Sequence, residues 1–356
     1  MADVLTVQSH AGPYRVLFSE SVARVLGSRP ELRQHFLVDA RIAQLYADAL
    51  KPVLAHRNTV LIEATEENKS LERIIPVIER LVENKIRRDH VLVAVGGGIV
   101  QDIACFIAST LLRGIPWNFV PTTLLAQADS CIGSKSSINL GPTKNILGTF
   151  NPPREVHICS DFLDTLEPKD IRSGIGEILK VHAIDGPASF DRVARDYRKL
   201  VEDRRVLQSY IRAALLIKHP FVEADEFDRG IRNVFNYGHS FGHAIESATN
   251  FVVPHGIAVS MGVDMANHIA VARGLLPDAA YRRMHPVLRE NYAMFAEIRI
   301  PVESMLAALT KDKKNTATRL VLIFPVGEEA KVQRVEVEPD GAFRSQCEAY
   351  LAGLRA

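Results

Sequence analysis

Hydrophobic positions in the first half of the chain form short runs that alternate with longer amphipathic stretches. The runs, rich in β-branched and aromatic residues, span 14–18, 34–39, 59–64, 88–98 and 117–123. Between them, residues 40–56, 71–86 and 102–114 carry apolar side chains at helical spacing. Because the strand-like runs are almost continuously apolar, they are typical of parallel strands covered by helices. This half therefore predicts an α/β domain with a parallel sheet.

From about residue 170 the pattern changes to long amphipathic helices. The predicted helices span 171–184, 189–203, 204–225, 235–250 and 255–274, and residues 320–327 predict a late strand. We therefore divide the chain into an α/β domain, residues 1–165, and a mostly helical domain, residues 166–356.

Composition narrows the class of protein. The 356 residues are 47% hydrophobic and 24% charged, with a formal net charge of +1, which is ordinary for a soluble globular protein. This charge gives no reason to expect binding to nucleic acid or to a membrane. The N-terminus, MADVLTVQSH, lacks a signal segment, and no run approaches the ~20 apolar residues of a membrane span. Four cysteines without CxxC spacing predict buried thiols. We expect a cytoplasmic protein.

A glycine-rich turn follows one predicted strand, in VLVAVGGGIVQD. Glycines between a strand and a helix let the backbone approach a pyrophosphate, which the helix N-terminus attracts. The motif is not GxGxxG, so a tight turn without a ligand is the alternative. Asp102 fits a cofactor ribose or nicotinamide amide, or an ordinary acidic residue near a helix start.

Residues 120–153 combine small residues with many polar ones and predict a long loop region. Lysines in such a loop suit a phosphorylated ligand, although a solvated surface loop is the simpler alternative. The polar residues concerned are Thr122, Thr123, Asp129, Lys135, Asn139, Lys144 and Asn145.

The stretch RNVFNYGHSFGHAIE, residues 232–246, predicts a helix with a polar stripe. Spacings of 4, 3 and 4 place Arg232, Asn236, His239 and His243 on one face, although either histidine alone fits a structural role. Further candidates are His255 and the pair Glu177 and Lys180. Glu177 with two histidines would make a three-ligand metal site with an open position. Spacing does not decide which histidine stays off the metal. Positive charges for an anionic substrate would come from Lys180, Lys218, Arg232, Lys313 and Lys314.

Several motifs in order resemble the sugar phosphate cyclases, the family that includes 3-dehydroquinate synthase. They are Glu66–Lys69, GGGIVQD, STLLRG, VPTTLLAQADS, GSK, TKNILGTFNPP, GEILK, DEFDRGIR, NYGHSFGHAIE, PHG and DKK. The resemblance implies an NAD-binding α/β domain with a parallel sheet and a mostly α-helical C-terminal metal-binding domain.

The resemblance also implies residue roles. The metal, zinc or alternatively cobalt, would be bound by Glu177, His239 and His255, with His243 beside the substrate. Substrate contacts would be Lys180, Lys218, Arg232, Asn236 and Lys313, with Asp129, Lys135, Lys144 and Asn145 around the phosphate and hydroxyls. Arg113 would reach the phosphate site of the neighbouring subunit in a homodimer. NAD contacts would be Asp39, Glu66, Lys69, Gly97, Gly98, Asp102, Thr122, Thr123 and Thr165, with Lys144 close to them.

The implied reaction turns a phosphorylated ketose into a carbocycle with loss of phosphate, and NAD is regenerated at each turnover. Arg232, Asn236 and Lys313 favour the carboxylated substrate, 3-deoxy-D-arabino-heptulosonate 7-phosphate, because a buried Arg–Lys pair without an anion is costly. The alternatives are a cyclase acting on sedoheptulose 7-phosphate or glucose 6-phosphate, a metal-dependent polyol dehydrogenase, and a non-catalytic ligand sensor.

Some positions depart from the family pattern. The differing residues are Gln101, Ser134, Ser136, Ser137, Thr143, His182 and Ile257. We expect His182 to lie close to the pocket, and the serines to alter the phosphate loop.

Overall fold

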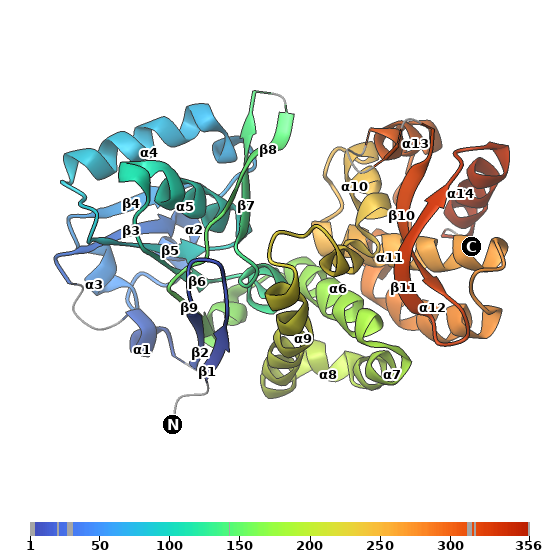
Figure 1. Cartoon of the computed structure of the whole chain (residues 1–356). Helices are drawn as coiled ribbons and strands as arrows, with labels where there is room; N and C mark the ends of the chain where they lie inside the picture. Colours follow the sequence, from blue (N-terminus) through green and yellow to red (C-terminus); the bar gives the residue numbers. More distant parts are fainter. Residues whose placement is uncertain are drawn as a thin grey trace. The chain divides into compact units, whose positions relative to one another are not determined.

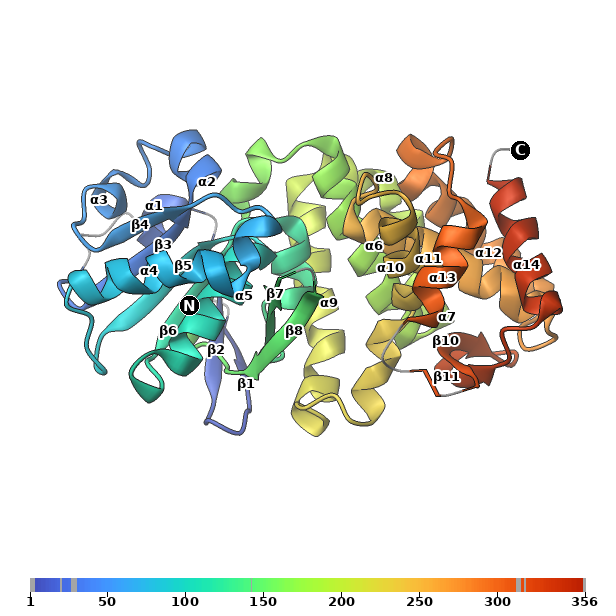
Figure 2. The same cartoon turned by 90° about the horizontal axis from the view of Figure 1, so that it is seen from above.

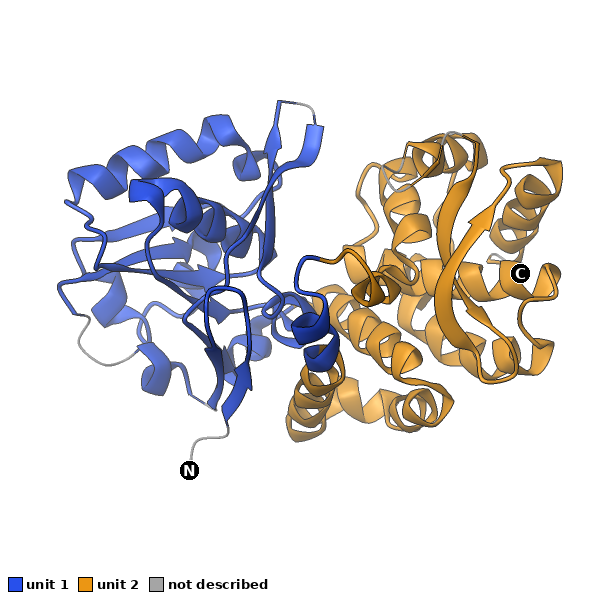
Figure 3. Cartoon of the chain, in the orientation of Figure 1, with its two compact units in different colours: residues 1–166, 219–227 blue, residues 167–218, 228–356 orange. Residues whose placement is uncertain are grey.

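The chain consists of two compact units. The computed structural model describes residues 4–19, 21–26, 31–141, 143–311, 315–316 and 318–354. Unit 1 comprises residues 1–166 and 219–227, and unit 2 comprises residues 167–218 and 228–356 (Figure 3). The predicted division after residue 165 assigned 219–227 to the second domain, whereas their contacts place them in unit 1. One reason is Glu226, which accepts hydrogen bonds from the Ser134 hydroxyl and the His10 backbone N–H.

Unit 1 is built on a seven-stranded sheet in the order β1-β2-β9-β6-β5-β3-β4. All neighbouring strands are parallel except β1 and β2, so the predicted parallel sheet is confirmed. The strands are β1 Val4–Val7, β2 Tyr14–Ser19, β3 Gln34–Asp39, β4 Thr59–Ile62, β5 Val91–Gly96, β6 Trp117–Pro121 and β9 Glu155–Cys159.

Helices cover both faces of this sheet, as its apolar strands require. They are α1 Val22–Leu26, α2 Ala40–Leu45, α3 Lys51–Leu54, α4 Leu71–Glu83 and α5 Gly98–Thr110. Figure 1 shows α4 on the opposite side of the sheet from α1 and α3, and Figure 2 shows α4 and α5 crossing it from above. Phe36, Val38 and Val95 pack with residues of α1, α2 and α3 in one buried cluster. Residues 40–56, predicted as an amphipathic stretch, form two separate helices, α2 and α3.

Residues 120–153, predicted as a loop region, contain regular structure. A π-helical turn, Ala126–Ser130, precedes a two-stranded antiparallel hairpin of β7 Lys135–Leu140 and β8 Thr143–Phe150. The sequence pattern did not predict this hairpin because β8 is largely exposed and its hydrophobic residues do not alternate regularly with polar ones. Short 3₁₀ helices span Glu67–Lys69, Leu111–Arg113 and Ser160–Thr165.

Unit 2 is mostly helical, as predicted. Its helices are α6 Pro168–Asp185, α7 Pro187–Arg195, α8 Tyr197–Glu202, α9 Arg204–Ala224, α10 His239–Ala248, α11 His255–Ala272, α12 Asp278–Tyr292, α13 Val302–Thr310 and α14 Gly341–Gly353. The last part of α9, from residue 219, belongs to unit 1. A hairpin of β10 Leu320–Val326 and β11 Lys331–Val337 completes unit 2, with 3₁₀ helices at Ile231–Asn236 and Ala293–Phe295.

Helix α11 is the centre of unit 2. Every residue from Gly256 to Asn267 is buried, and α6, α10, α12 and α14 all pack against it. The four cysteines, Cys105, Cys131, Cys159 and Cys347, are buried free thiols, as predicted. Within the described ranges, each helix is too short or too polar to cross a lipid bilayer.

Candidate active site

A carboxylate and two imidazoles converge in unit 2. The Nε2 atoms of His255 and His239 lie 3.3 and 3.8 Å from Oε1 of Glu177. The other carboxylate oxygen, Oε2, lies 2.5 Å from Nζ of Lys180, and both Glu177 and Lys180 are only 1% exposed. In the predicted i, i+3 pair on α6, one carboxylate oxygen of Glu177 therefore faces the Lys180 ammonium, and the other faces the two histidines.

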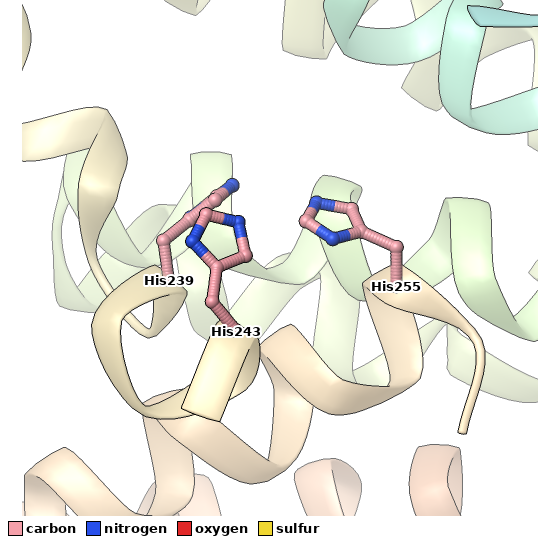
Figure 4. A group of neighbouring side chains, drawn as sticks. All are labelled: His239, His243 and His255. Atoms are coloured by element: carbon pink, nitrogen blue, oxygen red, sulfur yellow. The ribbon is translucent and has the colours of Figure 1, made fainter. Parts of the chain in front are cut away.

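Three histidines form a compact group in the same place. His239 and His243 project from α10 and His255 from the first turn of α11, and Figure 4 shows the three rings close together. One ring nitrogen of each lies within 4.8 Å of the corresponding atoms of the other two. His243 is the most exposed of the three, whereas His239 and His255 are half-buried beside Glu177.

Each of the two inner histidines is oriented by a partner at Nδ1. The Nδ1 of His239 lies 3.3 Å from the backbone carbonyl oxygen of Tyr237, and the Nδ1 of His255 lies 3.1 Å from Oε2 of Glu246. Burial alone would lower the pKa of His255, but hydrogen bonds with Glu177 and Glu246 outweigh it and raise the pKa to about 10. The two carboxylates thus stabilise a protonated ring, and a metal that binds at Nε2 would displace the proton there.

These donors fit a divalent transition metal. Carboxylate oxygen and imidazole nitrogen are ligands that zinc and cobalt take in proteins. Ligands of a tetrahedral zinc ion stand roughly 3.3 Å apart, given bonds of about 2.0 Å, and the Glu177–His255 separation is 3.3 Å. Three protein ligands would leave a position for an oxygen of the substrate.

Close glycine contacts lie between the three helices that carry Glu177, His239 and His255. A β-carbon on Gly176, the neighbour of Glu177, would lie 2.0 Å from the carbonyl oxygen of Gly256, the neighbour of His255. On α10, a β-carbon on Gly242 would lie 3.1 Å from the carbonyl oxygen of Ala258. A larger residue at Gly176 or Gly256 would force α6 and α11 apart, and one at Gly242 would require a shift of a few tenths of an ångström. The glycines of the GEILK, YGHSFGH and PHG motifs thus allow the close approach of the helices that carry Glu177, His239 and His255.

The prediction that Arg232, Asn236, His239 and His243 share one helical stripe is wrong. Helix α10 begins at His239, and Arg232 and Asn236 lie in the separate 3₁₀ helix Ile231–Asn236. Gly238, between them, adopts a left-handed φ of 75°, which ends one segment and redirects the chain before the next. The i, i+4 relation holds only for the two histidines.

Buried cations cluster in unit 2. Lys180, Lys218 and Arg232 are 1, 6 and 5% exposed. The Nζ atoms of Lys180 and Lys218 lie 5.7 and 6.0 Å from the centroid of the Phe235 ring, a favourable cation–π distance. Asn236 is half-buried and its Nδ2 donates to the Asn233 carbonyl oxygen. The predicted Lys313 and Lys314 lie outside the described residues.

His182 is not where the sequence predicted it. It is 2% exposed, its Nδ1 lies 2.8 Å from the Ser189 hydroxyl of α7, and its ring packs edge-on against Tyr210 of α9. Two residues along a helix turn the side chain by about 200°, so His182 faces away from Lys180. Burial, with a smaller contribution from Arg192, lowers the pKa of His182 to about 4.

In unit 1, the residues predicted to bind NAD line up along one edge of the sheet. Asp39 ends β3, Gly97 follows β5, and Thr122 and Thr123 follow β6; these three strands are adjacent and parallel. Thr165 lies beyond the end of β9, where its hydroxyl meets that of Tyr46 at 3.0 Å. The carboxyl edge of a parallel sheet is where open α/β folds bind their ligands.

The glycine turn leaves room for a ligand. A β-carbon on Gly97 would lie 2.9 Å from the Thr123 side chain, whereas one on Gly98 would meet nothing within 4 Å. Thr122, whose N–H donates to the Gly96 carbonyl oxygen, is 1% exposed. Its hydroxyl has no hydrogen-bond partner among the described residues. The open space at Gly98 and this buried polar atom, on a residue bonded to the first glycine of the turn, fit a polar cofactor.

Lys69, Asp102 and Asn145 form a hydrogen-bonded group. The Nζ of Lys69 donates to Oδ2 of Asp102 at 3.0 Å and to Oδ1 of Asn145 at 2.8 Å, and lies 3.7 Å from Glu66. Burial raises the pKa of Asp102 to about 6, although Lys69 and the Ser137 N–H oppose this effect. The motif residues Glu66–Lys69 are thereby connected to both the glycine-turn helix and the β7–β8 hairpin.

The remaining unit 1 candidates are Asp129, Lys135, Lys144 and Arg113. Asp129 is half-buried in the π-helical turn, and Lys135 and Lys144 are exposed on β7 and β8. Arg113 is exposed at the end of a 3₁₀ helix with a φ of 64°. Among the departures from the family pattern, Gln101 exchanges hydrogen bonds with Ser130, and Ser134 donates to Glu226 at 2.6 Å.

Two residues of unit 2 were missed by the sequence analysis. Glu246 contacts His255, and the Phe235 ring contacts both Lys180 and Lys218. The position of Glu246, three residues after His243 on the same helix, is a signal that could have identified it. Nothing in the local sequence distinguishes Phe235 from a core residue.

Comparison with known proteins agrees with this architecture. Residues 59–173 match the model of the 3-dehydroquinate synthase N-terminal domain, and residues 174–315 match that of the C-terminal domain. A 3-dehydroquinate synthase of Alkaliphilus oremlandii is 35% identical over 296 residues, which cover 83% of this chain and 81% of the relative.

Two solved structures share the fold. A 2-epi-5-epi-valiolone synthase from Streptomyces hygroscopicus, with NAD⁺ and Zn²⁺ bound, is 27% identical with a TM-score of 0.80, over 96% of each chain. A 2-deoxy-scyllo-inosose synthase in complex with carbaglucose-6-phosphate, NAD⁺ and Co²⁺ has a TM-score of 0.82 over 98% of this chain and 100% of the other; at 24% identity it shows the fold alone. The domain matches and the curated relative establish that this chain belongs to the 3-dehydroquinate synthase family.

Proposed function

We propose that this chain is a sugar phosphate cyclase that converts 3-deoxy-D-arabino-heptulosonate 7-phosphate to 3-dehydroquinate with loss of phosphate. The observation that carries the proposal is the arrangement in unit 2. Glu177, His239 and His255 converge there, and the same unit buries three cationic side chains. A cation site and buried cations together suit a polyhydroxylated, anionic substrate.

The cofactors follow from the donor sets of the two units. Glu177, His239 and His255 would hold a divalent metal, zinc or cobalt. NAD would bind at the carboxyl edge of the unit 1 sheet, near Gly98 and Thr122. When bound, NAD supplies reversible hydride transfer, and the metal stabilises negative charge that develops on oxygen.

The side chains of unit 2 would bind and orient the substrate. Arg232 and Asn236, with Lys313, would hold its carboxylate, because guanidinium and amide groups donate paired hydrogen bonds to such an anion. Lys180 and Lys218 would donate to its oxygens. His243, the most exposed histidine of the group, would exchange a proton at a ring nitrogen as phosphate leaves.

In unit 1, we propose that the segment around Lys135, the phosphate loop, binds the substrate phosphate. Lys135 would pair with the phosphate oxygens, and Asp129 and Asn145 would bind hydroxyls. Lys144 would serve the cofactor. Glu226 supports this loop, since it accepts the hydrogen bond of Ser134, which precedes Lys135.

The buried cations favour the carboxylated substrate over neutral-headed sugars and small polyols. Lys180 is paired with Glu177, and Lys218 and Arg232 are also buried; a substrate carboxylate would add a negative charge that these cations can bind. A polyol dehydrogenase has no anion to bind and gains nothing from these charges.

A phosphate-release assay tests the proposal. The protein would be incubated with substoichiometric NAD⁺ and zinc and with a panel of carboxylated heptulosonate, sedoheptulose and glucose phosphates. Multiple turnovers with the heptulosonate alone support the assignment. Turnover of sedoheptulose 7-phosphate or glucose 6-phosphate instead would assign a different cyclase, and stoichiometric NADH without phosphate would indicate a dehydrogenase.

We also propose that the protein acts in the cytoplasm as a homodimer, with Arg113 contributing to the partner's phosphate site. The exposed position of Arg113 is consistent with this role. If Arg113 acts across the interface, Arg113→Ala and His243→Ala variants, each inactive alone, will regain activity when mixed and allowed to exchange subunits. Unchanged inactivity in mixtures shown to contain heterodimers would place Arg113 in its own subunit's site.

A further inference from the structure

Glu246 lies on the helix that carries two of the three clustered histidines. It follows His239 by seven residues and His243 by three, so all three side chains share one face of α10. Its carboxylate reaches the neighbouring helix α11, where Oε2 lies 3.1 Å from Nδ1 of His255. The Glu246 side chain is 13% exposed, and that of His255 is 33% exposed.

This contact determines which nitrogen of His255 is available as a ligand. A carboxylate accepts a hydrogen bond, so the proton of the neutral ring stays on Nδ1 and the lone pair is on Nε2. Nε2 is the atom that faces Glu177, at 3.3 Å. Glu246 and Glu177 therefore approach opposite nitrogens of one ring.

The local chain geometry holds Glu246 and His255 at this distance. The backbone N–H of Phe251 donates to the Glu246 carbonyl oxygen at 2.7 Å. Asn250 and Phe251 both have positive φ, which turns the chain sharply after α10. The connection from residue 249 to residue 254 thus begins near Glu246 and ends at His255, and the carboxylate–imidazole contact spans it.

The two inner histidines differ in this respect. His239 is oriented by a neutral backbone carbonyl, whereas His255 is oriented by a charged side chain. A carboxylate partner makes an imidazole a stronger donor than a carbonyl does, because it stabilises positive charge on the ring.

We propose that Glu246 is a positioning residue that fixes the tautomer and orientation of His255 and strengthens it as a metal ligand. The inference rests on the metal site of the proposed function and is independent of the substrate. The alternative is that Glu246 only fastens the connection between α10 and α11, which would affect folding but not the metal.

Metal binding to the purified metal-free protein distinguishes these roles. Zinc affinity is measured by competition with a chromogenic chelator for the wild type, Glu246→Gln and Glu246→Ala. Loss of a carboxylate that supports a ligand histidine typically weakens metal affinity by 10–100-fold. We expect a loss in this range for Glu246→Ala and a smaller loss for Glu246→Gln, whose amide oxygen still accepts from Nδ1 but lacks the charge.

Two further readouts separate positioning from folding. The visible absorption bands of the cobalt-loaded protein report ligand geometry, and they should differ between Glu246→Ala and the wild type. The unfolding temperature of the metal-free protein should be nearly unchanged in Glu246→Gln. This variant carries the test if Glu246→Ala does not fold. Glu202→Gln, at an exposed glutamate on α8, is the matched control and should retain wild-type affinity.

Wild-type zinc affinity and cobalt spectra in both Glu246 variants would overturn the proposal. A loss of zinc affinity in Glu246→Gln that is matched by an equal loss of folding stability would also overturn it, because Glu246 would then only stabilise the connection between α10 and α11. If the wild type itself binds no zinc, the metal site of the proposed function fails as well. Normal metal binding without phosphate release would refute only the proposed reaction.

Discussion

Gly176 of α6 packs directly against the backbone of Gly256 of α11, with no side chain between them. A β-carbon on Gly176 would stand 2.0 Å from the Gly256 carbonyl oxygen and 2.6 Å from the Ser260 hydroxyl. The next residue after Gly176 is Glu177, and the residue before Gly256 is His255. The spacing of these two backbones therefore sets the distance between a carboxylate and an imidazole.

Substitution of Gly176 tests this dependence. In Gly176→Ala the added methyl must push α6 and α11 apart, which we expect to cost about 3 kcal/mol of unfolding free energy and to weaken zinc retention. Gly353→Ala, at the open end of α14 where a β-carbon meets nothing within 4 Å, should leave both unchanged. Denaturant unfolding and metal content after dialysis check the prediction. Wild-type zinc retention in Gly176→Ala would show that the glycine contact does not set the ligand spacing.

Substitutions on the two sides of Gly238 should have different effects. A substitution after Gly238 should affect metal retention, and one before it should affect substrate binding. His239→Ala removes a proposed ligand and should abolish zinc retention. Arg232→Ala should keep the metal and raise KM by roughly 10–100-fold, the cost of losing a charged hydrogen bond. Elemental analysis and steady-state kinetics measure the two effects. Loss of metal from Arg232→Ala would mean that the roles are divided incorrectly.

NAD affinity should depend on the protonation of Asp102. Because burial raises its pKa to about 6, the carboxylate is ionised at neutral pH and gains a proton as the pH falls through 6. If the carboxylate accepts a hydrogen bond from the cofactor, the Kd for NAD⁺ should rise below this pH. Calorimetric titration from pH 5 to 8 measures the trend. Asp102→Asn should bind weakly with a flat profile, and a pH dependence that persists in this variant would assign the effect to another group.

His182 should make the protein less stable in acid. Its folded pKa is about 4, against 6.5 in the unfolded chain. Between these values the unfolded chain binds a proton at His182 that the folded chain excludes, so stability falls as the pH decreases from 6.5 to 4. The full effect is about 3 kcal/mol. His182→Gln, which can still bond with Ser189, should lose less stability over this range in urea unfolding. An identical slope in the variant would contradict the pKa assignment.

The sequence predicted most of the fold because its signals were local. Apolar runs ending at Asp39 and Gly96 marked buried parallel strands, and the helical spacing over residues 255–274 marked α11. The hairpin β7–β8 escaped because its second strand has little buried surface. Position 238 escaped because a glycine inside an apparent helix can continue it or end it, and only the packing of Gly238 on α11 decides.

The candidate site was predictable by residue type and only partly by geometry. Glu177, His239 and His255 were named as a ligand set, but distance along the chain could not show that glycines bring them together. His182 was misplaced because its neighbours in sequence, Lys180 and Glu177, occupy another face of α6. Glu246 went unnoticed because its role depends on a residue from a different helix.

The return of residues 219–227 to unit 1 has a practical consequence for anyone who dissects this protein. A fragment that stops at residue 166 would lack Glu226, and so the acceptor for both the Ser134 hydroxyl and the His10 backbone N–H. Expression of residues 1–166 alone would therefore remove hydrogen bonds from within unit 1. A fragment meant to reproduce unit 1 must also contain residues 219–227.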